Sequence, residues 1–376
     1  MRILHIITGL GRGGAESSLV KVATGLARRG HDVEVVSLTG PGPMAEPLRA
    51  ANVSVQALER WQSSLILPGL VALGRRIDAF RPDVVQTWMY HADLLGGIAA
   101  RRAGVPMAWN VRHGALDERM STRTRWIARA CARWSSRLPD EIVYASQASR
   151  REHERFGYAS SRGLVIPNGY DLSGFARDEA ARRDAREALG WKDGFVLGHV
   201  ARYHPDKGHD LLLSALAKVR DALPEDTRIV LAGPGVDRAN AALLRGVADA
   251  GLAGVVDLMG ARDDVPTLMA AFDVFVLSSW SEGFPNVVAE AMAAGTPVVS
   301  TDAGDAALVV GDTGWIARRD SDDLARALRD ALAAPSAQLR LRGNAARKSV
   351  AQRYSLVAVV DAYEQLYARL AARRKL

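Results

Sequence analysis

The sequence predicts an α/β protein made of two doubly wound domains, each built around a mainly parallel sheet. Short apolar runs rich in β-branched residues alternate with helical segments along the chain. Most of these runs lead into a turn that opens the next helix, as in βαβ units. A length of 376 residues suits two domains with separate cores. We therefore expect one domain over residues 1–170 and a second over residues 171–355.

Composition indicates an ordinary globular protein, with 48% hydrophobic and 24% charged residues. The first apolar run, Ile3 to Leu10, is too short for a secretory signal, and no run approaches the ~20 apolar residues that span a bilayer. The single cysteine, Cys131, excludes an internal disulfide framework and indicates a reducing compartment. We expect a cytoplasmic protein, with peripheral attachment at the inner face of the cell membrane as an open alternative.

Positive charge is concentrated in the first half of the chain. Residues 1–170 carry 23 Lys and Arg against 14 Asp and Glu, a net of +9, whereas the remainder carries −2. No basic module with interleaved aromatic residues and no zinc pattern accompanies this charge, so nucleic acid is not the expected partner. An anionic membrane surface, or an anionic lipid-linked acceptor, fits better.

The chain opens with a strand over residues 2–7 and a glycine-rich turn that contains Gly13 and Gly14. Glycine lets the backbone approach a phosphate closely, but such turns also occur without a ligand. The glycine spacing does not match a dinucleotide fingerprint, so we discount NAD. Further strands are expected over residues 31–36, 82–87 and 106–111. We interpret His91, after the third strand, as structural, and His113 follows the fourth.

Six arginines, and no acidic residue after the first of them, mark the segment from Leu116 to Leu138; they are Arg119, Arg123, Arg125, Arg129, Arg133 and Arg137. At about 100° per residue they fall on one broad helical face, with Trp126 among them. The opposite face is expected to hold Met120, Ile127, Cys131, Trp134 and Leu138. Two interpretations stay open, a packed helix with a solvated basic face or an attachment surface for membranes.

Strands over residues 141–145 and 164–166 complete the first domain, and a charged surface helix is expected over residues 177–187. The second domain opens with a strand over residues 195–200, followed by Arg202 and Lys207, which could neutralise a diphosphate. Strands over residues 228–232 and 255–259 lead into loops that contain Gly233 and Arg262.

The most informative stretch runs from Phe272 to Ser300. It predicts a buried strand, a loop, a helix that ends at Gly295, and a second strand. Free N–H groups after Gly283 would attract a phosphate at the helix N-terminus. Glu282 and Glu290 would then face sugar hydroxyls, which carboxylates bind well. On spacing alone, Glu290 is equally well explained as a solvated helix residue.

The segment from Glu282 to Val299, E-G-F-P-N-V-V-A-E-A-M-A-A-G-T-P-V-V, resembles the Glu-x7-Glu segment of retaining glycosyltransferases with the GT-B fold, family 4. Matches run through nearly the whole chain and include Gly13-Gly14-Ala15-Glu16, the Arg202 and Lys207 pair, and the inter-domain segment before Asp171. Asp305-Ala306-Ala307 departs from the glycine-rich, Glu-containing pattern of the family. The resemblance implies two Rossmann-like domains facing a cleft, with the helix of residues 356–376 packing back on the first domain.

The resemblance also implies roles for individual residues. His113, Arg202, Lys207 and Glu282 are the expected catalytic residues. The expected donor-binding residues are Gly13, Gly14, Gly233, Arg262, Gly283, Phe284, Pro285, Asn286, Val287 and Glu290. No metal or cofactor is expected, because Asp320-Ser321-Asp322 precedes a helical pattern and is typical of a helix cap.

The implied function is transfer of a sugar, with retention of configuration, from a nucleoside-diphosphate sugar to a hydroxyl group. A UDP-sugar donor is favoured, and the acceptor would be lipid-linked or a saccharide in cell-surface polysaccharide or glycolipid assembly. Two alternatives stay open: a GT-B-fold nucleotide-sugar epimerase, and a degenerate protein that binds nucleotide sugars without turnover. Glu282 and Glu290 at the family spacing argue against the epimerase. The intact set of Arg202, Lys207, Glu282 and Glu290 argues against the degenerate protein.

Overall fold

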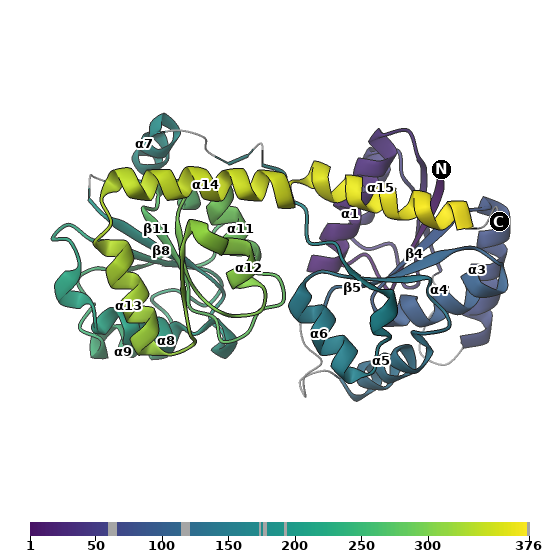
Figure 1. Cartoon of the computed structure of the whole chain (residues 1–376), viewed down its shortest axis with the longest axis horizontal. Coiled ribbons are helices and arrows are strands. Elements are labelled where there is room, and N and C mark those ends of the chain that lie inside the picture. Colours follow the sequence, from purple (N-terminus) through teal and green to yellow (C-terminus); the bar gives the residue numbers. More distant parts are fainter. Residues whose placement is uncertain (59–65, 114–120, 173, 176–178, 192–193, 374–376) are drawn as a thin grey trace. The chain divides into compact units, whose positions relative to one another are not determined.

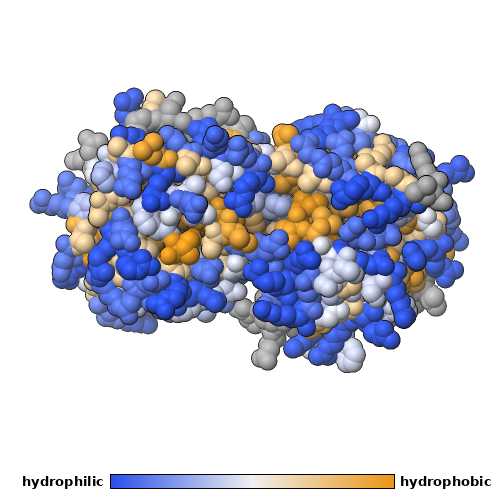
Figure 2. Space-filling view, viewed as in Figure 1, coloured by the Kyte–Doolittle hydropathy of each residue, from blue (hydrophilic) through white to orange (hydrophobic). Residues whose placement is uncertain are grey.

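The computed structural model describes residues 1–58, 66–113, 121–172, 174–175, 179–191 and 194–373. The chain divides into two compact units (Figure 1). Unit 1 comprises Met1–Gly169 and Leu356–Leu376, and unit 2 comprises Tyr170–Ser355. On the face seen in Figure 2, the surface of each unit is largely hydrophilic with scattered apolar patches.

Unit 1 contains a parallel sheet that has seven strands among the described residues, in the order β3-β2-β1-β4-β5-β6-β7. The strands are β1 (Arg2–Ile7), β2 (Asp32–Ser37), β3 (Ser54–Ala57), β4 (Val84–Trp88), β5 (Met107–Val111), β6 (Glu141–Tyr144) and β7 (Gly163–Val165). Between them lie α1 (Gly14–Arg28), α2 (Ala45–Ala50), α3 (Ile66–Phe80), α4 (Tyr90–Arg102), α5 (Thr122–Trp134) and α6 (Gln147–Phe156). Every residue of β4 and β5 is buried, as expected for parallel strands covered on both faces.

The last helix, α15 (Leu356–Arg373), belongs to unit 1 and packs against α1 (Figure 1). Val359, Val360, Tyr363, Leu366 and Tyr367 are buried in the same apolar cluster as the buried face of α1. At the rim of this contact, Glu364 accepts hydrogen bonds from Arg29 and from His31. The C-terminal segment thus completes the core of the unit in which the chain begins.

Unit 2 contains a parallel sheet with six strands among the described residues, in the order β10-β9-β8-β11-β12-β13. The strands are β8 (Val196–Val200), β9 (Arg228–Ala232), β10 (Val256–Leu258), β11 (Val274–Leu277), β12 (Val298–Thr301) and β13 (Trp315–Ala317). The helices are α7 (Glu179–Ala188), α8 (His209–Ala217), α9 (Ala241–Asp249), α10 (Val265–Ala271), α11 (Asn286–Ala293), α12 (Ala306–Val310), α13 (Ser321–Leu332) and α14 (Ser336–Tyr354). Gly295, with φ of 78°, ends α11 as predicted.

The arginine-rich helix differs from the prediction at one residue of its buried face. Residues 114–120, which include Arg119 and Met120, lie outside the described part of the chain. Cys131 is buried as predicted, whereas Trp134 is 45% exposed, so its assignment to the buried face was wrong. Trp134 is the last residue of α5, and its ring stacks against the Arg137 guanidinium instead of entering the core.

One further predicted helix is present in unit 2. The charged helix expected over residues 177–187 is α7, which begins at Glu179, and residues 177 and 178 lie outside the described part. Arg186 anchors it by donating to the Ala271 carbonyl and to Asp273. Among the helices that the structure describes, none is long and apolar enough to cross a membrane.

Candidate functional site

The strand order of unit 2 reverses between β8 and β11, which are hydrogen-bonded neighbours. From β8 the chain proceeds to β9 and β10 on one side, and from β11 it proceeds to β12 and β13 on the other. In an open parallel sheet, the loops that leave the carboxyl ends of two such strands border a crevice where ligands bind. The loop after β8 contains Arg202 and Lys207, and the loop after β11 contains Glu282.

The structure brings Lys207 and Glu282 into direct contact. The Lys207 ammonium donates to Glu282 Oε1 over 2.7 Å, and the Ser279 hydroxyl donates to the same oxygen over 2.7 Å. The two charged side chains are 23% and 10% exposed, so solvent screens this pair less than a surface pair. Both hydrogen bonds end on Oε1, which leaves Oε2 to accept hydrogen bonds from a ligand hydroxyl.

Backbone contacts fix the two loops against each other. Gly208 has a φ of 62°, and a Cβ there would lie 2.0 Å from the Ser278 carbonyl oxygen, so only glycine fits. The Ser278 hydroxyl donates to the Lys207 carbonyl over 3.0 Å, and the Trp280 N–H donates to the Asp206 carbonyl over 2.8 Å. Lys207 and Glu282 are therefore held by a rigid pair of loops.

Gly233 and Arg202 belong to adjoining loops of the same sheet edge. A Cβ on Gly233, whose φ is 145°, would lie 2.1 Å from the Ala201 carbonyl oxygen, so Gly233 permits close packing beside Arg202. The Arg202 side chain is exposed. Arg262, which stays a predicted donor-binding residue, forms two hydrogen bonds with Asp264, and this pairing raises the pKa of Arg262. The structure thus ties Arg262 to its own loop.

Four predicted donor-binding residues lie at the start of α11: Phe284, Pro285, Asn286 and Val287. The Phe284 ring stacks on Tyr170 at 6.2 Å, and the Tyr170 hydroxyl donates to Asn286 Oδ1. Pro285 precedes the helix as its N-cap residue and is buried, while Val287 packs partly into the core. These contacts give Phe284 and Asn286 structural partners within unit 2.

Gly283 and Glu290 lie on either side of that turn. The Gly283 carbonyl accepts a hydrogen bond from the Asp305 N–H over 3.3 Å, and a Cβ on Gly304 would lie 2.2 Å from the Glu282 carbonyl oxygen. The loop after β12 therefore supports the Glu282–Gly283 turn from behind. Glu290 is half-buried on α11.

A cavity of about 440 Å³ borders the Lys207 loop, and sequence reasoning did not identify it. It is lined by Tyr203, His204, Pro205, Asp206, His209, Asp210 and Trp280. Trp280 is 37% exposed and Tyr203 42% exposed. Exposed aromatic faces beside carboxylates suit a sugar ring, which has apolar C–H faces and hydroxyl edges. The only sequence signal was the presence of aromatic residues next to the two charged motifs.

His209 in this cavity predicts acid sensitivity. Burial lowers the pKa of His209 from 6.5 to about 4, and neither ring nitrogen has a hydrogen-bond partner among the residues that the structure describes. The unfolded chain therefore binds more protons between these two pH values, so the free energy of unfolding falls as pH drops from about 6.5 to about 4. We expect His209→Phe to reduce this fall by roughly 2 to 3 kcal/mol. Urea unfolding at pH 7 and pH 4.5 measures it, and an unchanged pH dependence would contradict the assignment.

In unit 1, the predicted residues lie at the corresponding sheet edge. Gly13 is the N-cap residue of α1, and Gly14 is its first residue; a Cβ on Gly14 would meet no atom within 4 Å. His113 follows β5 and is exposed, its ring packs edge-on against Tyr90 at 5.9 Å, and its carbonyl accepts from Ser149 over 2.5 Å.

Asp320 has the structural role that we predicted for it. It is the N-cap residue of α13, and its carboxylate accepts from the Asp323 N–H over 2.8 Å. In the described part of the chain, no group of three or more His, Cys, Asp or Glu side chains is placed to hold a metal ion.

Comparison with known proteins identifies the family. Residues 12–173 match Glycosyltransferase Family 4, and residues 194–334 match Glycosyl transferases group 1. The chain is 30% identical over 325 residues to 2-deoxystreptamine glucosyltransferase of Streptomyces kanamyceticus, covering 83% of this chain and 82% of that protein. It is 29% identical over 313 residues to UDP-Gal:alpha-D-GlcNAc-diphosphoundecaprenol alpha-1,3-galactosyltransferase of Escherichia coli, covering 80% and 79%.

A solved structure agrees with this result over almost the whole chain. HepE of Anabaena in complex with UDP is similar to it with a TM-score of 0.83 and 25% sequence identity, covering 98% of this chain and all of that one. The expected GT-B architecture, with two Rossmann-like units, is therefore confirmed. The chain belongs to the GT-B glycosyltransferases of family 4 and group 1.

Proposed function

We propose that this glycosyltransferase moves a sugar, with retention of configuration, from a UDP-sugar to a hydroxyl group of a lipid-linked or saccharide acceptor. The observation that carries the proposal is the contact between Lys207 and Glu282 at the strand-order reversal of unit 2. An ammonium group there can stabilise a leaving diphosphate, while the adjacent carboxylate can bind the hydroxyls of the transferred sugar.

The predicted site residues would contact different parts of the substrates. Lys207 and the exposed Arg202 would bind the diphosphate, and the N–H groups after Gly283 would add hydrogen bonds at the start of α11. Glu290 would bind the ribose. His113, on unit 1, would orient or polarise the sugar. The departing phosphate oxygen would help to remove the acceptor proton, which gives a reaction on one face of the sugar without a protein nucleophile.

The choice of substrates rests on the relatives. HepE was solved with UDP, and the Escherichia coli relative is named for UDP-Gal and for an acceptor on diphosphoundecaprenol. We therefore favour a UDP-sugar donor and an acceptor from cell-surface polysaccharide or glycolipid assembly.

A panel of labelled nucleotide sugars tests the proposal. With a diphosphoprenyl-linked sugar as acceptor, we expect a UDP-sugar to give a glycosylated lipid whose new linkage keeps the donor's anomeric configuration by NMR. An epimerised nucleotide sugar, or binding without any product, would favour the two rival functions instead.

The proposal includes activity that does not require a divalent metal. Lys207 and Arg202, together with the α11 amides, supply positive charge and donors to the diphosphate without a cation. We expect the transfer rate in about 5 mM EDTA, a large excess over trace metal, to stay within roughly twofold of the untreated rate. Loss of the rate with EDTA and its return with Mn²⁺ would refute a metal-independent reaction.

The α5 surface supports a proposal that unit 1 attaches to anionic membranes. Trp126 is 65% and Trp134 45% exposed, and the Arg129 and Arg137 guanidinium groups lie over their rings at 5.8 and 5.9 Å. Exposed tryptophan beside arginine is typical of surfaces that bind at a membrane interface. A cytoplasmic protein attached at the inner face of the membrane would meet a lipid-linked acceptor there.

Sedimentation with phosphatidylserine vesicles measures this attachment. We expect binding that weakens with salt and falls about 30-fold in Arg129→Gln/Arg133→Gln, since each basic residue near an anionic surface contributes about 1 kcal/mol. The matched control is Arg101→Gln/Arg102→Gln, which removes two exposed charges from α4 of the same unit. Equal losses in both double variants would mean that net charge, rather than α5, attracts the protein.

A further inference from the structure

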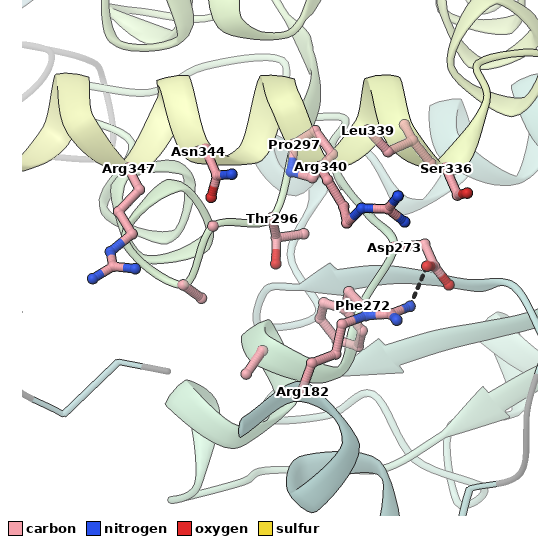
Figure 3. Close-up of a pocket in the computed structure, with 13 residues that line it drawn as sticks. Arg182, Phe272, Asp273, Thr296, Pro297, Ser336, Leu339, Arg340, Asn344 and Arg347 are labelled. Carbon is pink, nitrogen blue, oxygen red and sulfur yellow. Dashed lines mark hydrogen bonds and ion pairs between the residues drawn. The ribbon is translucent and has the colours of Figure 1, made fainter. Parts of the chain in front are cut away.

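A second cavity of unit 2, of about 320 Å³, lies at the opposite edge of the sheet from the Lys207–Glu282 pair. Phe272 and Asp273, which precede β11, line it, as do Gly295, Thr296 and Pro297, which precede β12. Lys207 and Glu282, in contrast, lie in the loops that follow the carboxyl ends of β8 and β11. The cavity is therefore separate from the donor site proposed above. Figure 3 shows that α14 covers one side of it.

Arginine dominates the lining of this cavity. Arg182 of α7 and Arg340 and Arg347 of α14 line it, and Asp273 is the one carboxylate among its described lining residues. Asp273 already accepts hydrogen bonds from Arg182 and from Arg186, the latter over 2.6 Å. Figure 3 shows Arg340 and Arg182 extending from opposite sides towards the end of the cavity near Asp273. The cavity therefore carries an excess of positive charge.

Other α14 side chains of the cavity are available to a ligand. Arg340 forms no ion pair or hydrogen bond with another described residue. The Ser336 hydroxyl and the Asn344 amide, which are neutral hydrogen-bond donors, also line the cavity. The carboxyl end of α11 repels an anion, but its partial negative charge amounts to only about half an elementary charge. Its last carbonyls are moreover occupied, because the Gly295 and Thr296 N–H groups donate to them.

We propose that this cavity binds a small phosphorylated anion, with Arg182 and Arg340 contacting the phosphoryl group. A guanidinium group can donate two parallel hydrogen bonds to two oxygens of one phosphate. Two guanidinium groups that face the same space therefore bind a phosphate dianion more tightly than they bind a carboxylate, which carries one charge. Asn344 and Arg347 lie further along α14 and would contact the rest of a phosphorylated metabolite. The cavity is preformed, because α14 packs directly on the turn that ends α11: a Cβ on Gly343 would lie 1.9 Å from the Gly295 carbonyl oxygen.

Calorimetric titration of the full chain tests this site. The probes are inorganic phosphate and glucose 1-phosphate, which distinguish free phosphate from a phosphorylated sugar. The test variant is Arg340→Gln/Arg347→Gln. Its matched control, Lys348→Gln/Arg183→Gln, also removes two positive charges, one each from α14 and α7, the two helices whose arginines line the cavity, at positions outside the lining. Lys207→Gln serves as the control for binding at the donor site.

We expect the dissociation constant for at least one probe to rise about 100-fold in the test variant, roughly tenfold for each arginine lost. It should stay within threefold of wild type in the Lys348/Arg183 control and in Lys207→Gln. Equal weakening in the test and control doubles would overturn the proposal, as would binding lost only in Lys207→Gln. Absence of binding by wild-type protein below about 10 mM of either probe would also overturn it.

Discussion

Replacing Lys207 with glutamine is expected to lower kcat/KM for sugar transfer by roughly 100- to 1,000-fold, the loss typical when one preorganised donor to a developing negative charge is removed. An ammonium has three N–H donors, and Glu282 occupies one of them. The others would face the leaving diphosphate, whose charge grows in the transition state. The variant also removes the cation that pairs with the Glu282 carboxylate, whose side chain is 10% exposed, and a nearly buried charge without its partner costs stability.

Steady-state kinetics with the best donor of the panel measure this effect. Lys218→Gln is the matched control, because Lys218 forms a similar 2.7 Å pair with Asp322 on the surface of the same unit. We expect its kcat/KM to stay within twofold of wild type, since exposed pairs contribute little. A Lys207→Gln enzyme with the same thermal stability and less than threefold loss would remove Lys207 from the proposed site.

The two glutamates should separate in their kinetic effects. A charge-assisted hydrogen bond contributes roughly 1.5–3 kcal/mol, or about 10- to 150-fold. The transferred sugar gains positive charge in the transition state, so Glu282→Gln should mainly lower kcat. The ribose does not change during the reaction, so Glu290→Gln should mainly raise the donor KM.

Varied-donor kinetics distinguish these outcomes, with Glu225→Gln as a control at an exposed glutamate of the same unit. If both site variants kept the wild-type kcat and donor KM, the two glutamates would be structural residues. If Glu282→Gln raised only KM, its carboxylate would bind the donor equally in the ground and transition states, and its assigned role would be wrong.

The sequence was sufficient for the fold because its signals are local. Apolar runs such as β8 and β11, and the glycine that ends α11, depend on hydrophobic spacing and backbone conformation, which neighbouring residues specify. Trp134 shows the limit of this approach. Helical periodicity assigned it to the buried face, but at the last turn of α5 the chain leaves the core and the indole stays exposed.

The candidate site needed information that no local pattern contains. Lys207 and Glu282 are 75 residues apart, and they meet because β8 and β11 are neighbours, which is a property of strand order. The same holds for Arg182 and Arg340, which line one cavity from two helices. Arg262 was assigned to the donor site by resemblance, and its pairing with Asp264 two residues later became visible only in three dimensions.

The placement of α15 has a consequence for how the chain folds as it is synthesised. Translation proceeds from the N-terminus, and domains generally fold as they emerge from the ribosome. Here the first unit to emerge lacks Tyr363, Leu366 and Tyr367 of its core until the final segment has been made. Unit 2, whose residues are contiguous, can finish folding earlier. The nascent N-terminal unit therefore waits with an apolar groove along α1 uncovered, at the stage when chaperones bind such surfaces.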